Sequence, residues 1–228
     1  MRWIMCIFLC SVASLLFAQA PPARPPVQPP PLRQYPILTE HRLSLLQDYL
    51  RFHYGMTSTD LSEPAMIVVH YTAIGSLTGT LRTFKPDLLP AGRTDIKGHG
   101  DVNVSVHYVI AKDGAVYRLQ PDNIAARHII AFNWCTLGIE LVARNEKELT
   151  QPQLASCARL CAWLAQEHPS VRYLIGHHEY ADPSRPHYVL YREHDPTYKP
   201  TRQYDPGDAF MKNLRFLLAR DYGVSLEE

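Results

Sequence analysis

The sequence predicts an α/β fold in which a mixed central β-sheet is flanked by helices, within one globular domain over residues 37–228. Three observations support this prediction. Short apolar segments alternate along the chain with segments of helical periodicity, an Asp-Gly turn joins two of the apolar segments, and the longest helical pattern lies between two expected strands. A domain of this length can bury a sizeable core.

The N-terminal segment has the organisation of a secretory signal peptide. Arg2 precedes an apolar stretch over residues 3–17, and Ala18-Gln19-Ala20 supplies small residues for cleavage. The stretch is shorter than a membrane-spanning helix requires, and no later segment replaces it. We therefore expect cleavage near Ala20, no transmembrane segment, and a periplasmic or secreted protein.

Proline dominates the next segment, residues 21–36, which includes Pro29-Pro30-Pro31. Such a composition favours extended polyproline II structure over a packed element. We interpret the segment as a spacer, with a docking motif for a partner as the alternative.

Charge and cysteine content exclude some classes of protein. The chain has 23 Lys and Arg and 22 Asp and Glu, and loss of Arg2 with the signal balances them, so bulk attraction to nucleic acid is not expected. Beyond the signal there are three cysteines, an odd number that is not a disulfide framework. Cys157 and Cys161 lie on one face of an expected helix, and we expect them to be buried free thiols. A disulfide between Cys135 and either of them is the alternative.

The first half of the domain shows a helix, a strand and a hairpin in that order. Thr39 is suited to cap a helix with leucines on one face, and Gly55 to end it. Residues 65–69 form a buried strand that ends at His70. Alternating valines predict a strand over 102–110, and Lys112-Asp113-Gly114 turns it into a second strand over 115–119.

The second half adds two strands and two helices. Residues 136–142 read as a strand, Thr150 caps a helix with apolar residues from Leu154 to Leu164, and residues 171–175 form a strand that ends just before His177. The segment 181–204 has no clean periodicity and is expected to be a long loop, of the length that is usually functional or partly disordered. A last helix begins near Asp208 and ends at Gly223.

Three polar residues stand where a metal ligand is the simplest explanation. His70 and His177 follow apolar strands, and Asp205 opens Asp205-Pro206-Gly207 ahead of the last helix. Two imidazoles and one carboxylate leave a tetrahedral Zn²⁺ one open position, which distinguishes a catalytic site from a structural one. The sequence therefore predicts a zinc hydrolase.

Glu140 is a charged residue between Ile139 and Leu141 in an expected strand. If its side chain faces the metal, it can take a proton from a water molecule that zinc acidifies and pass it to a leaving amine. The alternative is that it faces solvent through strand alternation.

The chain resembles the zinc-dependent N-acetylmuramoyl-L-alanine amidases that share a fold with peptidoglycan-recognition proteins. The resemblance extends over about residues 66–218 and rests on four segments, which are 68–72, 104–117, 133–141 and 176–178 together with 202–207. It implies a single domain of the peptidoglycan-recognition-protein type, Zn²⁺ on His70, His177 and Asp205, and catalysis by Glu140. By the same resemblance, the substrate contacts are His128, Asn133 and Tyr71.

The chain departs from the family pattern in two places. An insertion over about 181–199 separates His177 from Asp205 and brings His187, His194 and Asp195 as other candidate ligands. In addition, Gln203 stands where the family commonly has a lysine that stabilises the oxyanion. Gln203 could donate a neutral hydrogen bond, or Lys199 or Arg202 could reach back with a positive charge.

The resulting hypothesis is hydrolysis of the amide between N-acetylmuramic acid and L-alanine, with peptidoglycan or muropeptides as partner and wall turnover or remodelling as the role. The signal peptide argues against the cytoplasmic recycling branch of the family. A peptidoglycan-binding protein without activity and a zinc amidase of another substrate are the alternatives. Sequence alone leaves the oligomeric state open.

Overall fold

The computed structural model describes residues 25–61 and 63–228, so the expected signal peptide lies outside the described residues. A six-stranded sheet has the order β1-β4-β3-β5-β2-β6. Its strands are β1 (Leu32–Gln34), β2 (Met66–Tyr71), β3 (Tyr108–Ile110), β4 (Val116–Arg118), β5 (Thr136–Leu141) and β6 (Tyr173–Gly176). Only β3 and β4 pair antiparallel, as expected for the hairpin, which makes the sheet mixed.

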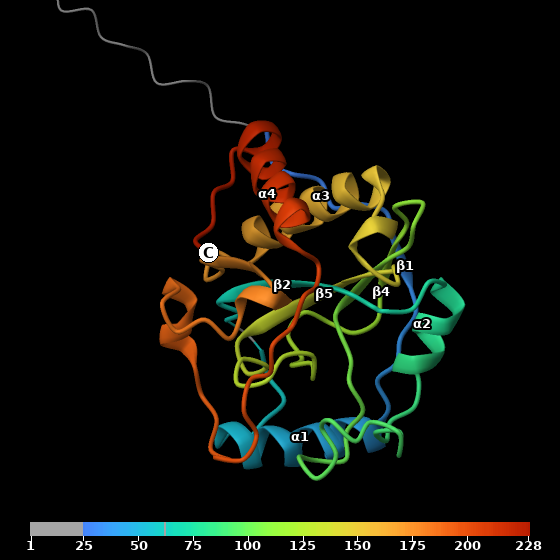
Figure 1. The fold of residues 1–228 in the computed structure, drawn as a ribbon, viewed down its shortest axis with the longest axis vertical. Coiled ribbons are helices and arrows are strands. Elements are labelled where there is room, and N and C mark those ends of the chain that lie inside the picture. Colours follow the sequence, from blue (N-terminus) through green and yellow to red (C-terminus); the bar gives the residue numbers. More distant parts are fainter. Residues whose placement is uncertain (1–24, 62) are drawn as a thin grey trace, which may run out of the picture.

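Helices cover both faces of this sheet. Figure 1 shows α3 (Gln151–Glu167) and α4 (Asp208–Leu217) on one side, and α1 (Glu40–Tyr54) on the other. A fourth helix, α2 (Leu77–Phe84), follows β2. Short turns of 3-10 helix lie at Glu146–Glu148, His177–Glu179 and Pro186–Leu190, and α4 continues into a π-helical turn at Leu218–Tyr222. The predicted α/β class, with one mixed sheet between helices, is confirmed.

The predicted helix ends agree with the structure because the capping side chains act locally. Thr39 accepts a hydrogen bond from the backbone N–H of Arg42, and Gly55 takes the left-handed conformation at the end of α1. At α3, Thr150 and Gln153 form a reciprocal capping box. Gly223 likewise ends the last helical turn in the left-handed conformation.

The proline-rich segment differs from the predicted spacer. Leu32–Gln34 pairs in parallel with β4 as an edge strand, Val27 donates from its backbone to Gln166 and Arg159 donates to the carbonyl of Gln28. An extended chain needs no change of conformation to join a free sheet edge, so residues 27–34 pack on the domain.

The strand predicted over 102–110 is shorter than expected. Only Tyr108–Ile110 joins the sheet as a strand. The backbone N–H groups of Asn103 and Ser105 instead donate to residues in loops. The buried side chain of Asn103 donates to the carbonyls of Thr83 and Pro86, and the N–H of Ser105 donates to Arg127. The polar residues that alternate with the valines, Asn103 and Ser105, are therefore buried.

The core is formed by the apolar strands and by the faces of α1, α3 and α4 that pack on them. Cys135, Cys157 and Cys161 are all buried free thiols, so Cys135 pairs with neither of the others. Within the described part of the chain, no helix has both the length and the apolar character to cross a membrane.

Gln153 fastens α3 to the sheet and gives a test of the fold. Its buried amide donates to the carbonyls of Ile110 and Val142, beside its part in the capping box. We expect Gln153→Ala to lower the free energy of unfolding by about 2 kcal/mol, because it removes two buried hydrogen bonds and half of the capping box. The matched exposed variant Gln151→Ala should change it by less than about 0.5 kcal/mol. Urea denaturation measures both, and equal values for the two variants would contradict this assignment.

Candidate metal centre and active-site pocket

The three predicted metal ligands meet in space. His70 lies in β2, His177 follows β6 directly, and Asp205 precedes α4. The Asp205 carboxylate has one oxygen 3.1 Å from His177 Nδ1 and the other 3.3 Å from His70 Nδ1. One nitrogen or oxygen from each residue lies within 4.8 Å of the others, and no other such group occurs among residues 25–61 and 63–228.

Strand register accounts for the two histidines. In parallel pairing, β2 matches Val69 with Gly176 of β6, so the next residues, His70 and His177, stand at the same level. Their ring centroids are 4.3 Å apart. Because both strands are buried and apolar, the register is strongly specified.

Asp205 returns to these histidines despite the insertion. The backbone N–H of His178 donates to the Asp205 carbonyl, at 2.8 Å, and so ties the two segments together. The ring of His178 contacts the Asp205 carbonyl, at 3.1 Å, and the Asp208 carboxylate, at 2.9 Å, and is not part of the convergent group. The buried Glu179 holds this turn by accepting from the N–H of Gly176 and from Arg215.

The alternative ligands in the insertion have other partners. His187 is buried against the carbonyl of Tyr180, and Asp195 pairs with His99 at 2.8 Å. His194 lies beside Gly55, at the end of α1. None of the three belongs to the convergent group.

The charges of the convergent group are set by burial and by mutual contact. Burial, with the neighbouring His177, lowers the pKa of His70 to about 4, so its imidazole is neutral at physiological pH. Burial opposes ionisation of Asp205, but the hydrogen bonds from His177 and His70 outweigh it and lower its pKa well below the usual range. The group thus offers neutral nitrogen and anionic oxygen.

Glu140 faces this group and not solvent. The register of β2 with β5 pairs it directly with His70, and both line one pocket. Its Oε2 is enclosed and has no hydrogen-bond partner. Burial, with the nearby charge of Asp205, raises the pKa of Glu140 well above its usual value. A buried carboxyl oxygen without a partner is costly, which indicates a ligand or substrate contact.

His128 lies behind His70. Its Nδ1 is 3.0 Å from His70 Nε2, and its Nε2 is 3.0 Å from the Thr136 hydroxyl. If Nδ1 of His70 is the atom that holds a metal, Nε2 carries the ring proton and donates to His128. Gly138 of β5 makes room for this ring, because a Cβ there would lie 2.9 Å from its atoms. Although His128 was predicted as a substrate contact and does line the pocket, both its nitrogens hold the site together.

Of the other two predicted substrate contacts, one is half-buried and one is internal. Tyr71 is half-buried and lines the pocket beside His70. Asn133 is buried, and its amide is fully used: the oxygen accepts from the N–H groups of His128 and Ile129, and the nitrogen donates to Tyr49 and Tyr54. Asn133 therefore holds the turn that carries His128 and also lines the same pocket as His128, and its contact with substrate stays a prediction.

The residues considered as oxyanion donors are placed differently. Gln203 lines the pocket, with its amide nitrogen donating to the Thr201 hydroxyl at 2.8 Å. Lys199 and Arg202 are exposed and do not line it. The pocket wall instead includes Arg93, from the loop after α2, which sequence reasoning missed because the loop has no periodicity or motif.

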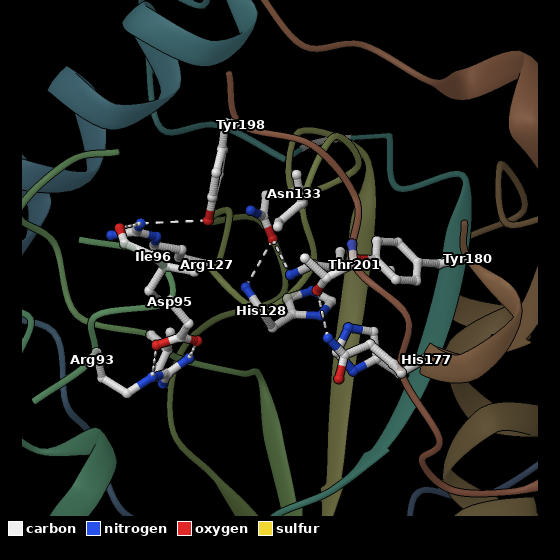
Figure 2. Close-up of a pocket in the computed structure, with 14 residues that line it drawn as sticks. Arg93, Asp95, Ile96, Arg127, His128, Asn133, His177, Tyr180, Tyr198 and Thr201 are labelled. Atoms are coloured by element: carbon white, nitrogen blue, oxygen red, sulfur yellow. Dashed lines mark hydrogen bonds and ion pairs between the residues drawn. The ribbon is translucent and has the colours of Figure 1, made fainter. Parts of the chain in front are cut away.

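Two adjoining hollows form the site. The one that holds the candidate ligands is an open hollow of about 910 Å³, and the other is an open hollow of about 420 Å³, with solvent at their mouths included. They share the residues Arg93, Val104, His128, His177 and Gln203. Figure 2 shows the second hollow, with Arg93 and Asp95 on one side of His128 and His177 on the other.

Comparisons with known proteins agree with this geometry. Residues 60–208 match the family model for N-acetylmuramoyl-L-alanine amidase. No curated protein sequence matches the chain. Among solved structures, the chain is similar to the endolysin amidase LysCS from Clostridium intestinale URNW, with 19% identity, a TM-score of 0.52 and coverage of 87% of this chain and 99% of that one.

A selenomethionine derivative of AmpD is similar as well, with 20% identity, a TM-score of 0.50 and coverage of 82% and 94%. At these identities the structural likeness shows a shared fold. The family match, however, extends over most of the chain and includes all three convergent residues. The chain belongs to the N-acetylmuramoyl-L-alanine amidase family.

Proposed function

We propose that this protein is a zinc-dependent hydrolase of the amide between N-acetylmuramic acid and L-alanine in peptidoglycan, acting outside the cytoplasm in wall turnover or remodelling. One observation carries the proposal: His70, His177 and Asp205 converge next to the unpartnered carboxyl oxygen of Glu140. Family membership supports the substrate, and the expected signal peptide supports the location.

The donor set fits Zn²⁺. Two neutral imidazoles and one carboxylate suit this metal, and a set of three protein ligands leaves a position open for substrate chemistry. The hydrogen bond from His70 to His128 fixes the ring orientation and tautomer that a ligand requires. Zinc held here would act as a Lewis acid on the amide carbonyl and would acidify water.

Glu140 would then carry out both proton transfers. Glu140 takes one proton from the attacking water as the water oxygen bonds to the carbonyl carbon, and it delivers that proton to the amide nitrogen as the C–N bond breaks. The products are a lactyl carboxylic acid on the sugar and a peptide with a free L-alanine amino group. The pairing of Glu140 with His70 across β5 and β2 supports this role.

Removal of the metal is the first test. We expect the purified protein to release peptides that begin with L-alanine from purified sacculi, to lose this activity in a chelator, and to regain it with added Zn²⁺. Mass spectrometry identifies the products. Intact sacculi with bound protein would favour a non-catalytic binding protein, and inactivity on sacculi with cleavage of other amides would favour a different substrate.

Replacement of the proposed base is the second test. We expect Glu140→Gln, which keeps the shape of the side chain, to lower kcat by about 10²- to 10⁴-fold because the proton transfers lose their carrier. Zn²⁺ stoichiometry should stay the same. The control Glu167→Gln removes an exposed carboxylate at the end of α3 and should leave kcat unchanged. A Glu140→Gln protein with full activity would exclude this mechanism.

Gly138 gives a test that reads metal binding without activity. We expect Gly138→Ala to displace the ring of His128, break its bond to His70 and weaken Zn²⁺ binding by about tenfold. Competition with a chromophoric chelator measures the affinity. Gly92→Ala is the matched control, since an added Cβ there meets nothing within 4 Å. Equal affinities in both variants would show that His128 does not support the metal ligand.

A further inference from the structure

The pocket that holds the candidate ligands has an uneven distribution of charge. Glu140 and Asp205 bring two carboxyl groups to its wall. Arg93 is the one lysine or arginine that lines it among the residues the structure describes. Amide hydrolysis builds negative charge on the carbonyl oxygen, and a fixed positive donor near that oxygen is the most effective way to stabilise it.

The guanidinium of Arg93 is oriented by one neighbour. Its Nε and Nη2 donate to the two oxygens of Asp95, at 3.0 and 2.9 Å, which leaves Nη1 outside the pair. Figure 2 shows this pair at the edge of the hollow, with the guanidinium turned toward the carboxylate. Arg93 lines the same pocket as Glu140 and His70.

The loop that carries Arg93 is held in place. Arg127 is buried and donates to the carbonyls of Ile96, His99, Gly100 and Val102, at 2.7 to 3.2 Å. His99 stacks on Tyr198 of the insertion, with ring centroids 4.3 Å apart. A donor on a fixed loop costs little reorganisation during the reaction, as a catalytic donor should.

We propose that Arg93 is a catalytic residue that donates a hydrogen bond from Nη1 to the carbonyl oxygen of the scissile amide. This inference rests on the proposed function. As water adds to the carbonyl carbon, the carbonyl π electrons move to oxygen, and Arg93 stabilises the charge that forms there. When the C–N bond breaks, the carbonyl reforms and the charge leaves that oxygen, so no further reactant is required. A planar guanidinium can serve Asp95 and the oxyanion at once.

Gln203 is a weaker candidate for this role. It is neutral, and its amide nitrogen donates to the Thr201 hydroxyl. A guanidinium brings a full positive charge to the hydrogen bond, whereas an amide brings only a dipole. Arg93 therefore takes the part of the family lysine from a different segment of the chain.

The experiment compares four variants on sacculi or a soluble muropeptide. We expect Arg93→Gln to lower kcat by about 100-fold while KM changes by less than about threefold, because the bond strengthens in the transition state. Arg93→Lys should recover about tenfold of the loss by restoring charge without the planar fork. Lys97→Gln is the matched control in the same loop, exposed and outside the pocket wall, and should have the wild-type kcat.

Asp95→Asn separates chemistry from loop structure. If Arg93 served only to hold Asp95, loss of either partner would lower kcat by the same factor. We expect instead that the fold-loss of kcat in Asp95→Asn is less than a third of the fold-loss in Arg93→Gln. Zn²⁺ stoichiometry and thermal stability of Arg93→Gln should match the wild type. A wild-type kcat in Arg93→Gln, a loss confined to KM, or an equal loss in Asp95→Asn would overturn the proposal. An inactive wild-type protein would overturn the proposed function itself. The proposal for Arg93 is tested separately, by the ratio of kcat between each variant and an active wild type.

Discussion

Parallel pairing of β2 with its two neighbours places His70, Glu140 and His177 at one level on one side of the sheet. Side chains alternate between faces along a strand, so a shift of one residue would turn His70 or Glu140 away from the pocket. The buried apolar residues of β2, with no exposure from Met66 to Val69, prevent such a shift. The same residues that form the core therefore fix the geometry of the site.

The remaining pieces of the site come from outside the sheet, and each has its own anchor. Arg215 and the N–H of Gly176 fix Glu179, and with it the turn after His177. The insertion is held at both ends, because the Tyr180 hydroxyl accepts from the N–H of Thr201 at 2.7 Å. The chain can therefore leave the site, extend over the surface and return to Asp205 without loss of position.

The middle of the insertion packs on α1 and on the loop after α2. His53 and Glu193 form a fully buried pair, at 2.7 Å, and His99 contacts Asp195. Buried pairs of this kind contribute less to stability than to a specific arrangement. Here the arrangement joins the insertion to the loop that carries Arg93, so the insertion supports one wall of the pocket.

What the sequence predicted depended on local signals. Capping residues such as Thr39 and Thr150 act within one turn of helix, and an apolar segment that ends in histidine marks a strand end, so both were predictable. The pairing of Leu32–Gln34 with β4 depends on a free sheet edge that composition does not report. Helix α2 was missed because it has only eight residues, three of them threonine and one glycine, which are weak helix formers.

The site was predictable to the extent that its residues lie at strand ends or in a motif. Asn133 lay in a segment similar to the family, yet its amide is consumed by backbone and tyrosine partners that only the fold brings together. Arg93 is the opposite case, a residue with no local signal that the fold places in the pocket wall. The candidate metal ligands are positioned by strands and a helix start, whereas the position of Arg93 depends on the contacts of its loop with Arg127 and the insertion. Differences in the insertion should therefore affect the rate of catalysis more than metal binding, because it supports the donor and does not supply the ligands.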